Sequence, residues 1–229
     1  MARLARLYAP DTTQLVQARL LPHIAQQAEV QAMKPQIARW LEQASGHYRL
    51  PIHAWSMTQD SIYLLSTPRE PRSISQVVQA IGRHLASSLK QGAVFASRYR
   101  SCLVESGDYL LACMIWLEIY VHQQEGISHP DRLPWSSAGM HTGRLYQDIA
   151  WITDHETYWR LGNTPFERQA RYRQLCEDGL SHAMSYKIQS ILQGQWALGT
   201  EEFIATMSEV ASRRVMPGQK GRPRKEDNK

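Results

Sequence analysis

The sequence predicts an α+β fold of the ferredoxin-like, split βαβ type, in which helices cover one face of an antiparallel sheet. Two observations predict it. Residues 1–126 alternate between strand-like and helix-like hydrophobic patterns in the order β-α-β-β-α-β, followed by one more helix. In addition, 43% of the 229 residues are hydrophobic and 21% are charged, which provides enough apolar material for a sizeable buried core.

Four strands are expected in the first half, each an apolar or β-branched run between turn signals. They cover residues 15–21, 52–57, 62–67 and 94–104. The second and third strands are joined around Gln59-Asp60, a turn-prone pair, so we expect them to form a hairpin.

Three helices are expected between and after these strands. The first begins near Pro35, which suits an opening turn, and ends at Gly46. The second begins with the Ser-Ile-Ser-Gln capping box of residues 73–76 and ends before Gly92. The third covers residues 108–122, with apolar residues at helical spacing on its buried side.

The second half predicts helices and a basic tail. Thr164 caps an expected helix over residues 165–178, and further helices are expected over 180–193 and 200–212. The predicted organisation is therefore an α+β core, a connector, a helical C-terminal region and a basic tail, which cover residues 1–126, 127–143, 144–212 and 213–229.

The excess positive charge is confined to the end of the chain. Residues 211–229 hold seven Lys or Arg and two Asp or Glu, which accounts for the whole net charge of +5. Residues 220–225 (Lys-Gly-Arg-Pro-Arg-Lys) resemble an AT-hook, an extended segment whose basic side chains enter the narrow minor groove of AT-rich duplex DNA. The alternative interpretation is a solvated tail.

Arginines of the first half are further candidates for phosphate contacts. Arg98 and Arg100 share one face of the expected strand 94–104, with Tyr99 on the other face. Arg83 lies outside the apolar stripe of its helix. Such residues could hold a DNA backbone without reading its sequence. For any one of them alone, a solvated surface arginine is the simpler interpretation.

Several classes of protein are disfavoured by the sequence. No apolar run approaches the ~18–20 residues that a membrane span needs, and the N-terminus has no signal-peptide pattern. The three cysteines are too few for a disulfide framework, so a cytoplasmic protein is expected. The motifs G-x-S-x-G, GxGxxG, the P-loop and H-E-x-x-H are absent, and residues 154–156 (Asp-His-Glu) are interpreted as surface.

Five segments, in order, are similar to the REP-associated tyrosine transposases, bacterial relatives of the HUH single-strand transposases. They are residues 1–4 (Met-Ala-Arg-Leu), 52–68 (Ile-His-Ala-Trp to Leu-Leu-Ser-Thr-Pro), 98–101 (Arg-Tyr-Arg-Ser), 109–114 (Tyr-Leu-Leu-Ala-Cys-Met) and 129–137 (His-Pro-Asp-Arg-Leu-Pro-Trp-Ser-Ser). The basic end from Arg213 resembles the end of longer family members. The likeness covers nearly the whole chain and depends on the order and spacing of these segments.

The resemblance implies an HUH transposase-like core that binds DNA. In the family, a His-hydrophobic-His strand and a polar helix residue hold a divalent metal, and a helix tyrosine attacks a DNA phosphate. On this chain the two histidines fall on Ser61 and Tyr63, and the tyrosine falls on Trp116. Serine and neutral tyrosine are poor ligands for such an ion, and tryptophan cannot form a phosphodiester. The resemblance therefore implies a catalytically degenerate, DNA-binding relative that uses no metal cofactor.

Two alternatives stay open. In the first, the chain is an active transposase whose displaced nucleophile is Tyr120, one helical turn after Trp116, with Mg²⁺ or Mn²⁺ held by Asp60, Glu118 and His122. Otherwise Tyr120 is a partly buried helix aromatic and Glu118 a solvated acid. In the second, the protein is an interaction module without nucleic acid, because residues 127–210 hold seven basic and ten acidic side chains.

The expected partner is DNA: a single-stranded hairpin held by the core, AT-rich duplex held by the tail, or both. No membrane partner is expected, and a homodimer is one oligomeric state that the sequence leaves open. The side chains expected to contact DNA are Arg3, Arg6, Arg83, Arg98, Arg100, Arg213, Arg214, Lys220, Arg222, Arg224 and Lys225.

Overall fold

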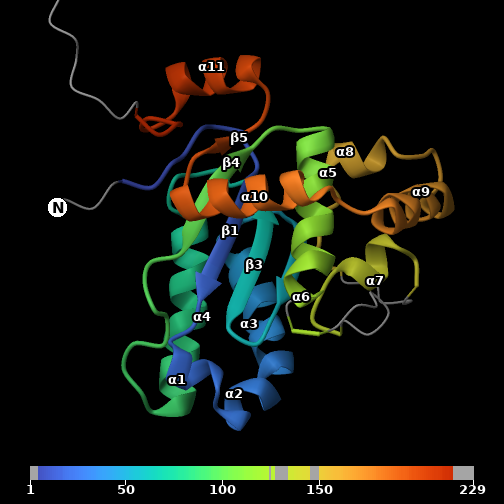
Figure 1. Ribbon diagram of the computed structural model, residues 1–229. Coiled ribbons are helices and arrows are strands. Elements are labelled where there is room, and N and C mark those ends of the chain that lie inside the picture. The colour runs from blue at the N-terminus through green and yellow to red at the C-terminus, as the bar shows by residue number, and fades with distance from the viewer. Residues whose placement is uncertain (1–4, 124, 127–133, 145–149, 219–229) are drawn as a thin grey trace, which may run out of the picture.

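The computed structural model describes residues 5–123, 125–126, 134–144 and 150–218, and its elements confirm the α+β class (Figure 1). Its sheet has five strands in the order β2-β3-β1-β4-β5. The strands are β1 (Gln14–Arg19), β2 (Ile52–Met57), β3 (Ser61–Ser66), β4 (Arg100–Val104) and β5 (Ala197–Leu198).

The first four strands have the predicted ferredoxin-like arrangement. β1 pairs antiparallel with both β3 and β4, and β2 pairs antiparallel with β3. β5 then adds to the edge in parallel with β4, so the sheet is mixed. The sequence does not predict β5, because two residues are too few to produce a period-two pattern.

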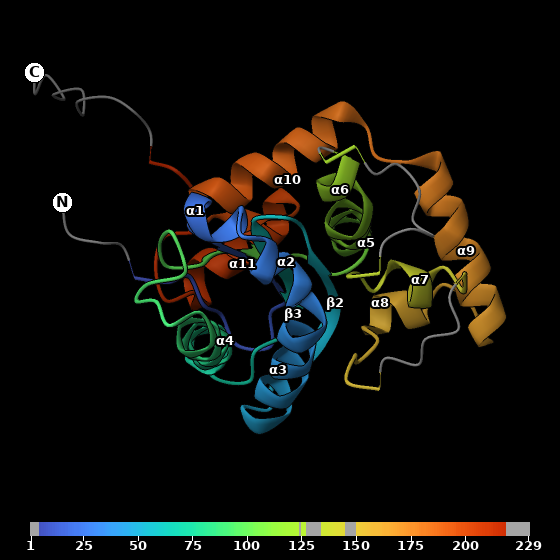
Figure 2. The same cartoon turned by 90° about the horizontal axis from the view of Figure 1, so that it is seen from below.

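Helices cover both faces of the sheet, which corrects the expectation of a single covered face (Figure 2). α3 (Lys34–His47) and α4 (Ser73–Leu89) pack on one face. On the other face lie α5 (Asp108–Ile115) and α10 (His182–Gly194), the latter supplied by the second half of the chain. Every residue of β2 and β3 is consequently buried, since successive side chains of a strand point to opposite faces.

The helix predicted over residues 108–122 is present as one continuous helical segment, but its hydrogen-bond pattern changes from α to π in the middle. α5 continues into a π-helical turn, η1 (Trp116–Tyr120), and then into α6 (Val121–Gln123). Four consecutive residues of the chain, 116–119, are buried in this turn. They are covered from two sides, by the sheet and by the helices of the second half.

The remaining helices are short or lie outside the sheet layers. They are α1 (Pro22–Ala25), α2 (Ala28–Ala32), α7 (Ala138–His141), α8 (Glu156–Trp159), α9 (Pro165–Asp178) and α11 (Glu201–Val210). α9, α10 and α11 confirm the three helices predicted for the second half, and Thr164 forms the predicted capping box with Glu167. Each helix within the described ranges is too short or too polar to cross a membrane.

Two local predictions are wrong. Residues 73–76 form no capping box, because α4 starts at Ser73 itself and Arg72 is its N-cap without a side-chain hydrogen bond. The expected strand 94–104 is shorter, because the chain bends at residues 96–98 and pairs continuously only from Arg100. Before the bend, Phe95 forms an isolated bridge with Leu20.

The two ends of the described chain are held together beside β5. The backbone N–H of Ser212 donates to the carbonyl of Tyr8 (2.8 Å), and the N–H of Tyr8 donates to Ser212 Oγ (3.0 Å). Arg213 donates to the carbonyl oxygens of Ala5 (2.8 Å) and Gln195 (2.6 Å). These bonds fix the N-terminal segment that carries Arg6.

Candidate functional site

A row of polar residues crosses the sheet on the face covered by α5, η1 and α6. It consists of directly opposed residues on four neighbouring strands, in the order Arg100, Gln17, Tyr63 and Ser56. Opposed residues of paired strands lie on the same face of a sheet. The row runs from Arg100, which is exposed, to Ser56, whose buried hydroxyl hydrogen-bonds to Nε2 of His122 on α6.

Ser61 and Tyr63, where the resemblance places the metal-binding histidines, are joined by Gln17. The side-chain amide of Gln17 donates to Ser61 Oγ (3.2 Å) and to the Tyr63 hydroxyl (2.9 Å). Burial raises the pKa of the Tyr63 phenol, which stays neutral. Its ring packs edge-on against Trp116, with 5.6 Å between the ring centroids. The structure therefore brings these three positions together as a packed and hydrogen-bonded group.

The π-helical turn begins at Trp116, the position on which the resemblance places the family's nucleophilic tyrosine. Such turns are rare and occur frequently at functional sites. Here the turn contributes the indole of Trp116 to the contact with Tyr63 and the carboxylate of Glu118 to a second buried cluster. The turn is therefore the element that links the polar row to the helices of the second half.

Asp60, Glu118 and His122 do not come together as metal ligands. Asp60 accepts a hydrogen bond from Ser61 Oγ (2.8 Å) and pairs with Arg19 (2.9 Å). Burial lowers the pKa of His122 to about 4, and its Nε2 is already bonded within the polar row. Over the described part of the chain, no three His, Cys, Asp or Glu side chains are grouped as a metal site. These residues do not fit a divalent ion.

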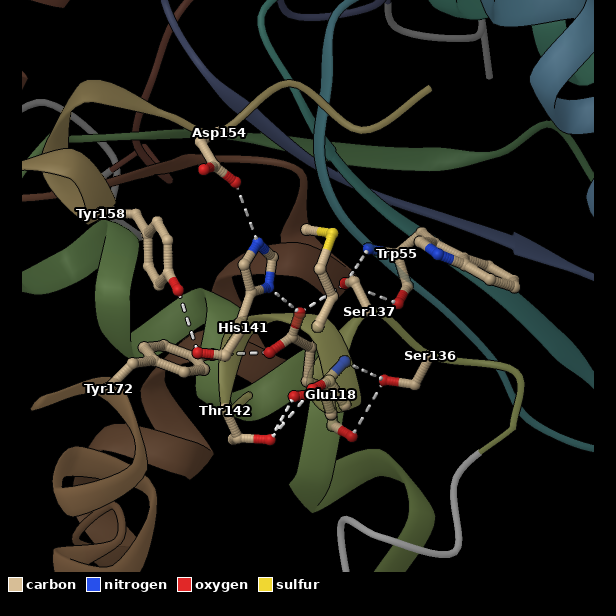
Figure 3. Close-up of polar contacts among 12 residues, drawn as sticks. Trp55, Glu118, Ser136, Ser137, His141, Thr142, Asp154, Tyr158 and Tyr172 are labelled. Atoms are coloured by element: carbon tan, nitrogen blue, oxygen red, sulfur yellow. Dashed lines mark hydrogen bonds and ion pairs between the residues drawn. The ribbon is translucent and has the colours of Figure 1, made fainter. Parts of the chain in front are cut away.

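Glu118 is the centre of a buried hydrogen-bond cluster (Figure 3). Its side chain is fully buried, and one carboxylate oxygen accepts from Nδ1 of His141 (2.6 Å) and from the Ser137 hydroxyl. The other oxygen accepts from the Tyr172 hydroxyl (2.7 Å). Asp154 lies 3.6 Å from Nε2 of His141. The cluster joins η1, α7, α9 and the segment before α8.

His141 carries the positive charge that balances Glu118. Burial alone would lower its pKa, but the negative charges of Glu118 and Asp154 outweigh burial and raise the pKa to about 9. Burial, together with Glu118, raises the pKa of Tyr172 well above its ordinary value, so its hydroxyl remains a donor. The cluster is a buried ion pair in which both carboxylate oxygens of Glu118 have donors, whereas Nε2 of His141 faces Asp154 at 3.6 Å without a hydrogen bond among the described residues.

Sequence reasoning missed this cluster. The interpretation of Glu118 as a solvated acid is wrong, and Asp154 is tied to His141 rather than being only a surface acid. A signal was present for Glu118. It lies four residues after Met114 and seven after Leu111, so it falls on the apolar side of its helix, where a carboxylate requires a buried partner.

Tyr120 is half-buried, as its simpler interpretation predicts, and its hydroxyl is engaged elsewhere. The hydroxyl donates to the carbonyl oxygen of Leu180 (3.0 Å) and accepts from the backbone N–H of the same residue. Both groups belong to the connection between α9 and α10. Tyr120 therefore ties this connection to η1.

Arg6, Arg83 and Arg98 converge on one pocket of about 430 Å³. They come from the N-terminal segment, from α4 and from the bend before β4. Arg83 and Arg98 are exposed, whereas the guanidinium of half-buried Arg6 lies 4.3 Å from the centroid of the Tyr99 ring. Within the described ranges, Nε of Arg6 is buried and has no hydrogen-bond partner. We call this site the arginine pocket.

Other predicted arginines adjoin the arginine pocket. A second hollow of about 500 Å³ is lined by Arg98, Arg100 and Gln195. Arg98 and Arg100 are exposed and Tyr99 is buried, as predicted, but Arg98 lies in the bend before β4 and not on a strand face shared with Arg100. Arg213 differs: burial and the charge of Arg214 lower its pKa, and its N–H groups are bonded to three backbone carbonyls. Arg213 thus holds the chain ends together, while Arg214 is exposed.

Comparison with solved structures identifies a match to this arrangement of elements. The chain is similar to a REP-associated tyrosine transposase bound to a REP hairpin, with a TM-score of 0.54 and 14% sequence identity. The match covers 67% of this chain and 93% of that one. This chain shares the transposase fold. No family model and no curated protein sequence matches it.

The likeness is one of fold, so the roles of individual residues rest on the geometry of this chain. That geometry groups Arg6, Arg83 and Arg98 at one pocket. It also groups Ser61 and Tyr63 of β3 with Trp116 of η1. The other predicted DNA contacts, Arg3, Lys220, Arg222, Arg224 and Lys225, lie outside the described residues.

Proposed function

We propose that this protein binds folded single-stranded DNA and does not cleave it. The observation that carries the proposal is the convergence of three arginines from distant segments on one pocket, with Arg100 beside it. A cluster of exposed guanidinium groups attracts a polyanion and holds phosphates without reading sequence. The solved structure with a similar fold is bound to a DNA hairpin, which supports a hairpin as the ligand.

The absence of cleavage is proposed from residue chemistry. Strand transfer by a tyrosine transposase needs a hydroxyl nucleophile and a metal that polarises the phosphate. Trp116 has no hydroxyl, and Ser61 and Tyr63 are bonded to Gln17 as neutral groups. The hydroxyl of Tyr120 is bonded on both sides to Leu180. We also propose the cytoplasm as the compartment, which is supported by the proposed DNA ligand and by the similar fold of a DNA-bound transposase.

Binding is tested by titrating the full chain with a DNA hairpin, with the same strand scrambled so that it cannot pair, and with an AT-rich duplex. We expect the hairpin to bind more tightly than the scrambled strand. The double variant Arg83→Gln/Arg98→Gln should bind the hairpin about tenfold more weakly. It should also reduce the slope of log affinity against log salt by about 0.7 to 0.9 for each arginine removed.

Arg171→Gln is the matched control, because Arg171 is an exposed arginine on α9, away from the arginine pocket. It should leave both affinity and salt slope unchanged. Binding that does not depend on salt would contradict the proposal and favour a protein-interaction module. Deleting residues 217–229 should weaken duplex binding more than hairpin binding if the basic tail holds adjacent duplex.

Cleavage is tested separately, with a labelled hairpin and Mg²⁺ or Mn²⁺. We expect neither wild-type protein nor Tyr120→Phe to form a covalent DNA adduct. An adduct that forms with wild-type protein and disappears in Tyr120→Phe would establish the active-transposase alternative and overturn the second half of the proposal.

A further inference from the structure

We propose that a second pocket, formed by α7, α8, α9 and the segment before α8, binds a free α-amino acid with an apolar side chain. Its ammonium group lies at Asp154 and its carboxylate at Arg168. The pocket has a volume of about 470 Å³, within the range of small-molecule sites, and shares no described lining residue with the arginine pocket. The proposal therefore does not depend on DNA binding. We call this site the α9 pocket, and the lining residues that matter here are Ile152, Asp154, Trp159, Pro165 and Arg168.

Arg168 supplies a buried cation to the α9 pocket. The residue is only 5% exposed, and its guanidinium carbon lies 3.8 Å from the centroid of the Trp159 ring. Its Nη1 donates to the carbonyl oxygen of Gly162 (3.2 Å). Among the described residues, Arg168 has no Asp or Glu within ion-pair distance. A buried guanidinium is costly unless its donors are bonded, and its planar fork matches a carboxylate. Arg168 is therefore arranged for an incoming carboxylate.

Asp154 supplies an anion to the same pocket. Its side chain is 26% exposed, and its carboxylate lies 3.6 Å from Nε2 of His141, a buried nitrogen without a hydrogen-bond partner among the described residues (Figure 3). Because 3.6 Å is too long for a hydrogen bond, the carboxylate keeps its acceptor sites for another donor. An ammonium group carries three N–H donors, so it can bind at Asp154.

The charges around the α9 pocket balance one another, which favours a zwitterion over an ion. His141 lies between the carboxylates of Glu118 and Asp154. Burial raises the pKa of Tyr158, Asp154 and Glu118 add to that rise, and Arg168 opposes it, so Asp154 and Arg168 both lie near this phenol. A ligand with a net charge would disturb a set of two acids and two bases. An α-amino acid instead carries its ammonium and carboxylate groups on one carbon, where each can meet its opposite charge.

The other walls of the α9 pocket fit an apolar side chain. Ile152, Trp159 and Pro165 line it, and Trp159 is 52% exposed. A ligand side chain that covers the indole removes apolar surface from water. The end of a peptide carries only one of the two charges, so it would leave either Asp154 or Arg168 without a partner. The pocket therefore favours a free amino acid over a peptide terminus.

The test is isothermal titration calorimetry of full-length protein with L-leucine and L-phenylalanine. We expect at least one of them to bind with a Kd below about 1 mM, and glycine to bind more weakly because it lacks an apolar side chain. Two blocked forms of the better ligand separate its charges. The amide lacks the carboxylate, and the N-acetyl form lacks the ammonium group. Each should bind at least about tenfold more weakly, as expected for the loss of a charged hydrogen-bonding group.

Two variants assign the charges of the ligand to residues. Arg168→Gln should bind the amino acid and its amide equally but still discriminate against the N-acetyl form, and Asp154→Asn should show the reverse. Arg171→Gln and Glu156→Gln are the matched controls, because both residues are exposed and lie outside the pocket lining. The controls should behave as wild type. Thermal unfolding establishes that all four variants are folded.

The outcomes decide the amino-acid site without reference to DNA. If wild-type protein binds neither amino acid, or binds the amino acid and both blocked forms equally, the proposal is wrong. It is also wrong if Arg168→Gln and Asp154→Asn discriminate between the ligands as wild type does. Should a variant not fold, the blocked ligands decide the matter with wild-type protein alone. Hairpin affinity, measured without amino acid, tests the proposed function separately.

Discussion

The arginine pocket and the Glu118 cluster are both made of charged groups, yet they differ in how those charges are satisfied. Around Glu118, every carboxylate oxygen has a donor, the counter-charge is supplied by His141, and both residues are buried. Nε2 of His141 has no hydrogen-bond partner among the described residues, but the carboxylate of Asp154 lies 3.6 Å away. At the arginine pocket, Arg83 is exposed and Nε of Arg6 has no hydrogen-bond partner among the described residues.

This difference indicates which region organises the fold and which is arranged for a ligand. A buried ion pair is costly to desolvate, and the donors to both carboxylate oxygens of Glu118 together with the two acids around His141 offset that cost, so the cluster serves architecture. Cations gathered at an open cavity repel one another in the unbound protein, and a bound phosphate relieves that repulsion. Each prediction below tests whether the two regions are separable in this way.

The largest effect is expected from Glu118→Leu. It leaves the charged imidazole of His141 and the hydroxyl of Tyr172 buried without their acceptor. Breaking a buried pair from one side costs about 3–5 kcal/mol of the free energy of unfolding, which urea denaturation measures. The exposed pair between Arg144 and Glu177 provides the control, since Glu177→Gln should change stability by less than about 1 kcal/mol.

The hairpin affinity of Glu118→Leu tests whether the Glu118 cluster and the arginine pocket are independent. If the two regions are separable, the folded fraction of Glu118→Leu should bind the DNA hairpin with wild-type affinity. A large loss of affinity in protein that is still folded would show that the Glu118 cluster takes part in binding, and would remove the distinction between architecture and ligand site.

A second prediction concerns pH. The pKa of His141 is raised from 6.5 to about 9 by folding, so its stabilising contribution is complete below pH 6.5 and is lost as pH rises through 9. Burial lowers the pKa values of His53 and His122 to about 4, so their neutral forms are favoured and stability is lost as pH falls from 6.5 towards 4.

The free energy of unfolding should therefore be greatest near pH 6.5. The decline on the alkaline side, about 3 kcal/mol at most by the size of the shift, should disappear in His141→Gln. The acid side should be flattened in His122→Gln. Urea titrations at a series of pH values provide the measurement, and stability that stays constant from neutral pH to pH 9 would contradict the charged His141.

Much of the fold was accessible from sequence because its signals are local. Strand-like runs and helical stripes located β1 to β4, α4 and the three helices of the second half, and their order implied the ferredoxin-like sheet. The second covered face was not accessible, because α10 packs on strands that precede it by many residues. β5 depends on pairing with β4 and has no pattern of its own.

For the candidate site too, local features could be predicted from the sequence and long-range contacts could not. Arg83, Arg98 and Arg100 were predicted from exposure on single elements, and the structure confirms that they are exposed. Arg6 joins Arg83 and Arg98 at one pocket because hydrogen bonds between residues 5–8 and 212–213 hold the N-terminal segment there. No local sequence pattern predicts those bonds. The partners of Glu118 lie on α7 and α9, so no local pattern could identify them.

A third prediction tests those bonds. Arg213→Gln removes hydrogen bonds to the carbonyls of Ala5 and Gln195 and releases the segment that holds Arg6 over Tyr99. We expect a loss of about 2 kcal/mol in the free energy of unfolding, since hydrogen bonds from a charged group are being removed. Hairpin affinity should also fall severalfold, because Arg6 is no longer fixed at the arginine pocket.

The control for this third prediction is Arg214→Gln. Arg214 is exposed and adjacent in sequence, so its loss removes a similar charge without releasing the N-terminal segment. If both variants lower affinity equally and neither changes stability, Arg213 acts as a phosphate contact rather than as the bond between the chain ends.

The smallest effect is expected from Tyr120→Phe. The hydroxyl of Tyr120 both donates to and accepts from the backbone of Leu180, so its removal leaves two polar groups of the α9–α10 connection without that partner. Because the connection is only half-buried and water can replace the hydroxyl, the cost should be about 1 kcal/mol by urea denaturation. Tyr186→Phe, at a tyrosine that is 72% exposed, should cost nothing measurable. Neither variant should change hairpin affinity, since the hydroxyl of Tyr120 is bonded to Leu180 and does not line the arginine pocket. If Tyr120→Phe keeps wild-type stability but changes hairpin affinity or adduct formation, the hydroxyl of Tyr120 contacts DNA. Tyr120 would then belong to the DNA-binding region and not to the structural region around Glu118.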